Sequence, residues 1–223
     1  MIRLQGVSKV FPGDPPIRAL IDTDLSVEEG EWLSIVGPSG AGKSTIMHLI
    51  GLLDAPTSGA YLLNGEDVSR ISADRRAKLR ATYFGFVFQT FHLVPGRSLG
   101  RNVELGLLYA GIPRQERIER SRKAIEAVGI LHRLESDVST LSGGEKQRAV
   151  IARALASDAK ILLCDEPTGN LDSVSGEKVF DAIRRLSEGG VTVIVVTHDP
   201  AVAALGDRVV SVVGGQIREG GAA

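Results

Sequence analysis

The feature that most constrains this chain is a glycine-rich loop between a short apolar stretch and an apolar helix. The stretch "EWLSIV" (31–36) comes before the loop, and "TIMHLIGLL" (45–53) follows it. The loop, "GPSGAGKST", fits the spacing G-x-x-x-x-G-K-[ST] with Gly37, Gly42, Lys43 and Ser44. A strand, this loop and a helix in that order predict a phosphate-binding loop in an α/β protein.

The residue types of this loop suit the phosphates of a nucleotide. The first amide groups of a helix lack intrahelical partners and point toward an anion. Glycine lets the backbone come close, Lys43 supplies a positive charge, and the Ser44 hydroxyl can ligate Mg²⁺. The alternative is a glycine-rich turn that only opens a helix, and the strand before the loop argues against it.

The rest of the chain indicates an α/β fold. Apolar segments at 83–89, 160–166 and 191–199 read as strands, and residues 208–220 read as a hairpin that turns at Gly214-Gly215. Unbroken apolar strands that alternate with helices are typical of a mostly parallel sheet covered on both faces. The opening residues, which include "IRALIDTDLSV", predict an N-terminal antiparallel β subdomain instead.

Between Gln89 and about Ala156 the pattern becomes helical. Residues 114–129 and 145–157 each place apolar side chains on one helical face, the first with Ile118, Ile125 and Val128, the second with Val150, Ile151, Ala154 and Leu155. We expect one domain, 1–223, with a core of about 1–89 and 157–223 and an inserted helical subdomain of about 90–156.

Two adjacent carboxylates end the apolar strand in "ILLCDEP". Burying either one without a nearby cation would be costly. We therefore expect Asp165 to hold Mg²⁺, directly or through water, and Glu166 to polarise an attacking water. An Asp-Glu pair by itself is weak evidence, because it could also be a helix N-cap.

Gln89 and His198 also stand at the ends of predicted strands. Ligands of open α/β sheets bind outside the carboxyl ends of the strands. Strand-end residues of these types are usually capping or surface residues. Here four predicted strand ends carry a phosphate loop, a glutamine, an Asp-Glu pair and a histidine, so we expect Gln89 and His198 to be functional.

A second helix start lies in "LSGGEKQR" (141–148). Ser142 and Glu145 have the spacing of a capping box, which would explain a helix start and nothing more. A capping box does not need Gly143 and Gly144, which weaken a helix unless something must approach the backbone. The segment is therefore a candidate for a second phosphate cradle.

Composition limits the possible partners. The chain has 223 residues, which suits one globular domain, and a formal net charge of −1, which gives no basic field for nucleic acid. The single cysteine, Cys164, cannot form an internal disulfide, in keeping with a reducing compartment. The apolar runs are too short to cross a bilayer, so we expect any membrane role to act through a partner.

Taken in order, these motifs resemble the nucleotide-binding subunit of ABC transporters over essentially the whole chain. "GPSGAGKST" is similar to the Walker A loop, "FVFQ" to the Q-loop and "LSGGE" to the signature. "ILLCDEP", "GNLD" and "VTHD" are similar to the Walker B strand, the D-loop and the switch-histidine segment. In that family two subunits enclose two ATP molecules head to tail, and each signature caps the ATP on the partner's Walker A loop.

The resemblance implies a role for each matching residue. Glu166, His198 and Gln89 are expected in catalysis, and Ser44, Gln89 and Asp165 at Mg²⁺. Phe11 is expected to stack on adenine, although the family commonly has tyrosine there; the alternative is a core side chain of the first hairpin. The phosphates are expected to be held by Gly37, Ser39, Gly40, Gly42, Lys43, Ser44 and Thr45. Across the dimer, the expected nucleotide contacts are Ser142, Gly143, Gly144, Glu145 and Asp172.

The segments "FGFVFQTFHLVP" and "RNVELGLLYAG" resemble the branch that serves macrolide export, lipoprotein release or cell division, although Gly106 replaces that branch's usual proline. The resemblance implies a homodimer and a permease that docks on about 89–111. The domain would then lie on the cytoplasmic face of the cell membrane, held there through the permease.

Three other classes of ATP-binding protein share some of these motifs. DNA-repair and chromosome-organising ATPases insert long coiled coils or zinc modules before the signature, and this interval is short, with no sustained heptads. Ribosome-acting ATPases usually carry two such domains in one chain. A small-molecule P-loop kinase has no use for "LSGGEKQR".

Overall fold

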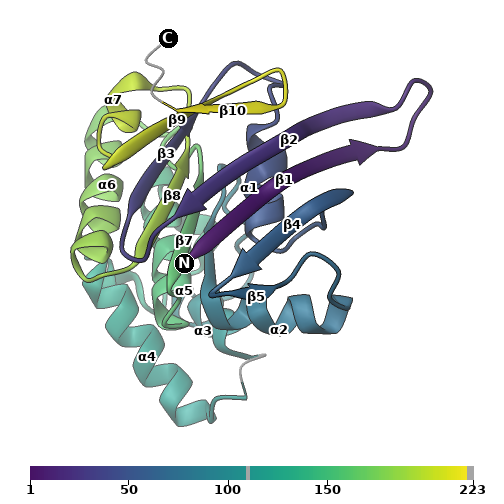
Figure 1. Ribbon diagram of the computed structural model, residues 1–223. Coiled ribbons are helices and arrows are strands. Elements are labelled where there is room, and N and C mark those ends of the chain that lie inside the picture. Colours follow the sequence, from purple (N-terminus) through teal and green to yellow (C-terminus); the bar gives the residue numbers. More distant parts are fainter. Residues whose placement is uncertain (109–110, 220–223) are drawn as a thin grey trace. The chain divides into compact units, whose positions relative to one another are not determined.

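The computed structural model describes residues 1–108 and 111–219 (Figure 1). These residues form two compact units. The first unit comprises Met1–Arg80 and the described part of Thr192–Ala223, and the second comprises Ala81–Val191. The boundary falls inside helix α2 (Ala73–Tyr83).

The first unit contains an antiparallel sheet in the order β2-β1-β4-β5. Its strands are β1 (Ile2–Phe11), β2 (Ile17–Val27), β4 (Ser58–Leu63) and β5 (Glu66–Asp67). β1 and β2 form one long hairpin, visible in purple in Figure 1. This sheet confirms the predicted antiparallel β subdomain at the N-terminus.

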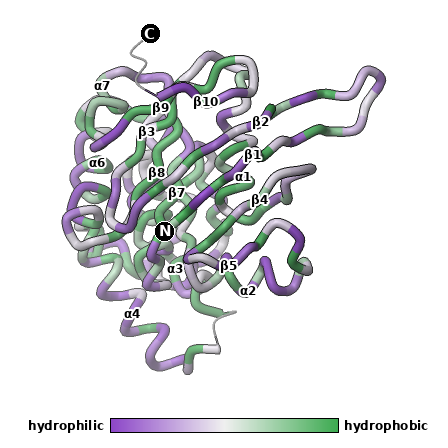
Figure 2. The backbone as a smooth tube through the Cα atoms, viewed as in Figure 1, coloured by the Kyte–Doolittle hydropathy of each residue, from purple (hydrophilic) through white to green (hydrophobic). Residues whose placement is uncertain are grey.

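A second sheet of the same unit positions the phosphate loop. Strands β9 (Arg208–Val213), β3 (Trp32–Val36) and β8 (Thr192–Val196) are parallel neighbours, and β10 (Gln216–Glu219) pairs antiparallel with β9. All five residues of β8 are buried, as expected for a strand covered on both faces, and the strand is largely hydrophobic in Figure 2. The predicted hairpin is also confirmed, since Gly214 and Gly215 both have positive φ angles.

Helix α1 (Lys43–Ile50) directly follows the phosphate loop, and short helix α7 (Pro200–Ala203) follows β8. The two sheets of the first unit are joined by a backbone hydrogen bond, in which Ile21 N–H donates to the Gly215 carbonyl at 2.8 Å. The phosphate loop is thus anchored to β3 and α1 at its two ends.

The second unit contains a parallel strand pair and most of the helices. Strand β6 (Phe84–Val87) pairs with β7 (Ile161–Asp165), and the α-helices are α3 (Leu99–Leu108), α4 (Arg114–Ala127), α5 (Gly143–Ala156) and α6 (Ser173–Glu188). Two single-turn 3₁₀ helices, Leu131–Arg133 and Val138–Thr140, precede α5. Gly85 lets α5 approach β6, because a Cβ atom there would lie 2.6 Å from the Ala154 Cβ atom.

The predicted helical faces are right for α5 and partly wrong for α4. In α5, Val150, Ile151 and Ala154 are buried, and Leu155 is half-buried. In α4, Ile125 is buried but Ile118 is 45% exposed, because the buried face of this helix begins only at Ser121. The first two turns of α4 therefore present a largely polar surface (Figure 2).

Candidate functional site

Three glycines of the phosphate loop have left-handed backbone angles, with φ values of 148° at Gly37, 76° at Gly40 and 107° at Gly42. A Cβ atom on Gly37 would lie 2.3 Å from the Val212 carbonyl oxygen, and one on Gly42 would lie 2.5 Å from that of Ala19. Neighbouring strands therefore exclude any side chain at these two positions. A Cβ atom on Gly40 would enter open space, so only its backbone angle favours glycine there.

The start of α1 has the form of an anion site. Its N-cap is Gly42, and no side chain caps the first turn. The Lys43 Nζ atom donates to the carbonyl oxygens of Gly37 (2.7 Å) and Pro38 (2.9 Å), so its charge is held over the loop. Ser39 and Ser44 are exposed, and Thr45 is half-buried. The site therefore brings open helix-terminal amides, hydroxyls and an ammonium together.

Two other predicted site residues belong to the first unit. Phe11 is the last residue of β1, half-buried, and pairs with Ile17 across the first hairpin. His198 is exposed two residues after β8, and the next residue, Asp199, caps α7 by accepting from the Ala201 N–H at 2.8 Å. Capping thus falls to Asp199 rather than to His198.

In the second unit, the two carboxylates stand at the end of β7. Asp165 is the last residue of the strand, and Glu166 has a φ of 45°. A left-handed angle at a residue other than glycine costs about 1–3 kcal/mol and concentrates at functional positions. Behind them Cys164 is fully buried, and burial raises the pKa of its thiol, so it is unsuited to act as a nucleophile.

Gln89, Glu166 and the segment 169–172 lie together in this unit. The Glu166 carbonyl accepts from the Gly169 N–H at 3.1 Å, and Asn170 Nδ2 donates to the Gln89 carbonyl at 3.3 Å. A Cβ atom on Gly169 would lie 3.3 Å from Gln89 Nε2. Asp172 caps α6 by accepting from the Ser175 N–H at 3.0 Å.

The predicted capping box at the start of α5 is confirmed. Ser142 Oγ accepts from the Glu145 N–H at 3.3 Å, and Glu145 Oε2 accepts from the Ser142 N–H at 2.8 Å. Arg133 Nε lies 3.1 Å from Glu145 Oε1 as an ion pair, without the direction of a hydrogen bond. Partial burial alone would raise the pKa of Glu145, but the Ser142 hydrogen bonds and the charge of Arg133 bring that pKa below its ordinary value.

The two signature glycines have partners within their own chain. A Cβ atom on Gly144 would lie 2.9 Å from the Cβ and Oγ atoms of Ser175, and one on Gly143 would lie 3.2 Å from Leu171 Cδ2. The interpretation that these glycines serve only an approaching phosphate is therefore incomplete. Gly144, which is buried, is required by the approach of α6, whereas Ser142 remains exposed.

Sequence reasoning missed two residues beside these sites. Ser175 sets the space at Gly144, and no pattern in the sequence signals it. Lys9 lies with its Nζ atom 4.9 Å from the centre of the Phe11 ring. Its position two residues before Phe11 on a predicted strand could have indicated this contact, because alternate strand residues share a face.

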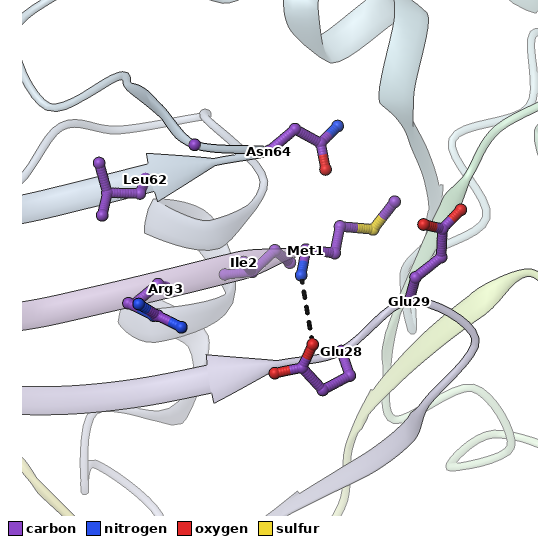
Figure 3. Close-up of a pocket in the computed structure, with 8 residues that line it drawn as sticks. Met1, Ile2, Arg3, Glu28, Glu29, Leu62 and Asn64 are labelled. Carbon is purple, nitrogen blue, oxygen red and sulfur yellow. Dashed lines mark ion pairs between the residues drawn. The ribbon is translucent and has the colours of Figure 1, made fainter.

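One cavity lies away from all predicted site residues. It has a volume of about 310 Å³ and lies beside the start of β1, the end of β2 and the turn after β4 (Figure 3). Its lining includes Glu28, Glu29 and Asn64, and the Met1 amino group pairs with Glu28 at 3.8 Å. Its place on the far ends of these strands separates it from Phe11 and the phosphate loop within the same unit.

The side-chain oxygen atoms expected at Mg²⁺ suit an ion that is held mainly by the phosphates of a bound substrate. Within residues 1–108 and 111–219, no cluster of three or more His, Cys, Asp or Glu side chains could hold a metal ion. The side chains of Ser44, Gln89 and Asp165 each carry an oxygen atom, the ligand type that Mg²⁺ prefers. Mg²⁺ is usually held by one or two carboxylates together with phosphate oxygens and water rather than by an all-protein cage.

A phosphate loop of this geometry, between a parallel strand and a helix, defines a P-loop nucleoside triphosphatase. The family described as ABC transporter matches residues 20–169, and the chain belongs to that family as its ATP-binding, ATP-hydrolysing domain. Its fold is the P-loop fold of these domains, with a mostly parallel sheet, an antiparallel N-terminal sheet and a helical region.

The curated relatives are longer proteins. The macrolide export ATP-binding/permease protein MacB of Nitrosomonas europaea is 47% identical over 97% of this chain and 33% of its own length. MacB 1/2 of Paracoccus denitrificans is 45% identical, with the same coverage. The chain thus spans about a third of the length of these relatives.

Solved structures match over almost the full chain. The ATP-binding cassette MJ0796, in a dimeric post-hydrolysis state bound to ADP and phosphate, is 38% identical, has a TM-score of 0.90 and matches over 98% of both chains. A second dimeric structure of MJ0796 is 39% identical, with the same TM-score. In the described part of this chain, no helix is long and apolar enough to cross a membrane.

Proposed function

We propose that two copies of this chain enclose two ATP molecules and drive a membrane permease. The observation that carries the proposal is a second glycine-rich helix start, at α5, in addition to the phosphate loop at α1. The start of α1 is uncapped by side chains, and that of α5 carries an exposed Ser142 beside a half-buried Gly143. One nucleotide site rarely needs two such starts, so the second serves the nucleotide on the partner. The dimeric state of MJ0796 supports the same arrangement.

Each residue then has a role in hydrolysis. Phe11 stacks on the adenine, and Ser39, Gly40, Lys43 and Thr45 hold the phosphates with the amides of Gly37 and Gly42. Ser44, Gln89 and Asp165 would hold Mg²⁺, which screens the phosphate charge when bound. Glu166 orients and polarises the attacking water, and His198 and Gln89 act with it in catalysis. From the partner come Ser142, Gly143, Gly144, Glu145 and Asp172.

The permease is proposed from the relatives. MacB proteins join an ATP-binding and a permease function in one protein, and the chain matches a third of their length. We infer a permease that docks on about 89–111, at the start of a helical subdomain of about 90–156, and that holds this domain on the cytoplasmic face of the membrane. Macrolide export, lipoprotein release and cell division are the candidate processes.

A mixing experiment tests the shared site. Lys43→Ala removes the phosphate-loop charge, and Ser142→Arg fills the signature cradle, so each homodimer is expected to lose ATPase activity. In a mixed dimer, one composite site carries both defects, and the other joins an intact Lys43 to an intact Ser142. Mixing the two variants should therefore restore part of the activity.

The control is a mixed dimer of wild type with Lys43→Ala. If this control hydrolyses ATP while the double mixture forms dimers but stays inactive, the signature serves its own chain, and the shared-site proposal is wrong. Co-purification with a membrane protein, rather than with DNA or ribosomes, separates the transporter function from the other classes of ATPase.

A further inference from the structure

Lys9 has an environment that its place on β1, an interior strand of the antiparallel sheet, does not require. Its Nζ atom lies 2.7 Å from Asp54 Oδ1, donates to the Ala55 carbonyl at 2.9 Å and lies 4.9 Å from the centre of the Phe11 ring. Only 12% of the Lys9 side chain is exposed. Two polar contacts, to Asp54 and Ala55, therefore hold the ammonium group over one face of the Phe11 ring.

The partners of Lys9 connect that ring to the helix of the phosphate loop. Asp54 and Ala55 lie in the segment that follows α1, the helix that begins at the phosphate loop. Three further hydrogen bonds tie the same segment to β1. Thr57 N–H donates to the Ser8 carbonyl (2.8 Å), Val10 N–H donates to Thr57 Oγ1 (3.0 Å), and Thr57 Oγ1 donates to the Val10 carbonyl (3.4 Å). Lys9 is thus the side-chain link between the end of α1 and the Phe11 ring.

The ion pair between Lys9 and Asp54 contributes too little stability to explain why the Lys9 ammonium group is held over the Phe11 ring. Asp54 is 38% exposed, and a pair with such a partner contributes little to stability. An ammonium over an aromatic face is attracted to the ring, and it also blocks that face. A ring fixed before the nucleotide binds loses less conformational freedom on binding than a mobile one.

We propose that Lys9 is a positioning residue for the base of the bound nucleotide, because it covers one face of Phe11 and leaves the opposite face for the base. The inference rests on the proposed stacking role of Phe11. Its consequence is specific: loss of Lys9 weakens the binding of a nucleotide that has a base, and leaves the binding of the phosphates alone unchanged.

The test compares the dissociation constants of ATP and of inorganic triphosphate for the full chain. Lys9→Met, which keeps the length of the side chain without its charge, should weaken ATP binding by about three- to tenfold. Its triphosphate binding should stay within about twofold of wild type. Lys9→Arg should restore most of the ATP affinity. Arg3→Met, a change of the same kind at an exposed position of the same strand, should change neither constant.

A double-mutant cycle shows whether Lys9 acts through the ring. In the Phe11→Ala background, Lys9→Met should cost less than about twofold in ATP affinity, because no ring remains to be positioned. Asp54→Asn, which loosens the ammonium without removing it, provides a second variant if Lys9→Met does not fold. It should reduce ATP affinity by about two- to threefold and leave triphosphate binding unchanged.

Two results overturn the inference in different ways. If Phe11→Ala lowers ATP affinity, and Lys9→Met weakens ATP binding by the same factor with and without the Phe11 ring, Lys9 does not act through Phe11. The stacking role of Phe11 then stands. If Phe11→Ala leaves the ratio of the ATP and triphosphate constants unchanged, the stacking role of Phe11 fails, and the role of Lys9 fails with it.

Discussion

A Cβ atom built on Gly144 would lie 2.9 Å from both the Cβ and the Oγ atom of Ser175. Gly144 is the second residue of α5, and Ser175 lies in the first turn of α6, just after the segment 169–172. The signature and this segment are therefore packed against each other within one chain. A change at either residue is expected to move the other, whichever chain's nucleotide the signature serves.

The first prediction is that Gly144→Ala destabilises the protein. Alanine would ordinarily stabilise a helix relative to glycine by about 1 kcal/mol. Here we expect a loss of about 1–3 kcal/mol in the free energy of unfolding, because the new methyl group overlaps Ser175. Chemical denaturation of Gly144→Ala, Ser175→Gly and the double variant should show a favourable coupling between the two changes.

Gly176→Ala is the matched control for this prediction. Gly176 is also helical and buried, but a Cβ atom there would meet only ordinary contacts, the nearest at 3.6 Å. Its substitution is expected to be neutral or stabilising. Additive effects of the changes at positions 144 and 175 would contradict the packing explanation.

The second prediction concerns Glu166. Glu166→Gln keeps the shape of the side chain but removes the charge that polarises water, so ATP should still bind while turnover falls by about 10²–10⁴-fold. We expect the variant to accumulate as an ATP-bound dimer, measurable by size-exclusion chromatography with and without ATP. Wild-type turnover, or a variant that binds ATP normally yet stays monomeric, would show that another residue has this role.

The third prediction follows from the electrostatics of Glu145. Its pKa lies below its ordinary value in the folded protein, so the unfolded chain takes up a proton there first as the pH falls. Its contribution to stability is complete above its unfolded pKa and is lost as the pH falls through the folded pKa. Between pH 6 and pH 3, the wild type should therefore lose more unfolding free energy than Glu145→Gln, as measured by urea denaturation.

Glutamine at position 145 can keep both hydrogen bonds of the capping box, so it removes the titration and spares the helix start. Asp67, Asp137 and Asp172, whose pKa values are also lowered, titrate in both proteins and cancel in the comparison. Parallel pH profiles for the two proteins would exclude the Arg133–Glu145 interaction as a source of stability.

The sequence was sufficient to predict the features that depend on residues close together in the chain. The phosphate loop, the strand ends and the capping box each follow from a fixed spacing of residue types, and the hairpin at Gly214-Gly215 follows from its turn chemistry. The left-handed angle of Glu166 has no such signal, because glutamate does not favour it. Such a conformation is imposed by the surrounding structure and is invisible in the local sequence.

Packing between elements was the part that the sequence could not supply. Ile118 and Ile125 occupy the same predicted face of α4, yet only Ile125 is buried, because helical periodicity gives a direction and not the extent of the surface that covers it. Gly144 shows the same limit. Two glycines at a helix start suggested that some group approaches the backbone, but the sequence does not tell whether that group is a ligand or a neighbouring helix.

The last prediction concerns the surface proposed for the permease. Of the apolar side chains within residues 89–111, Leu99 is fully buried and belongs to the core, so it cannot form part of a docking surface. Phe91, Leu93 and Leu105 are half-buried. Val94 and Leu108 are the more open positions, at 40% and 46% exposed. Tyr109 and Ala110, within the same proposed range, lie outside the described residues.

We therefore expect Val94→Glu and Leu108→Glu to weaken capture of the permease, because a charge would have to be buried against an apolar helix. The ATPase activity of the isolated domain should stay within about twofold of wild type, since surface changes rarely disturb the fold. Ile118→Glu is the matched control, since Ile118 is 45% exposed in the same unit but lies on α4, outside residues 89–111. If the control weakens capture as much as the two variants do, or if neither variant weakens it, the permease docks elsewhere.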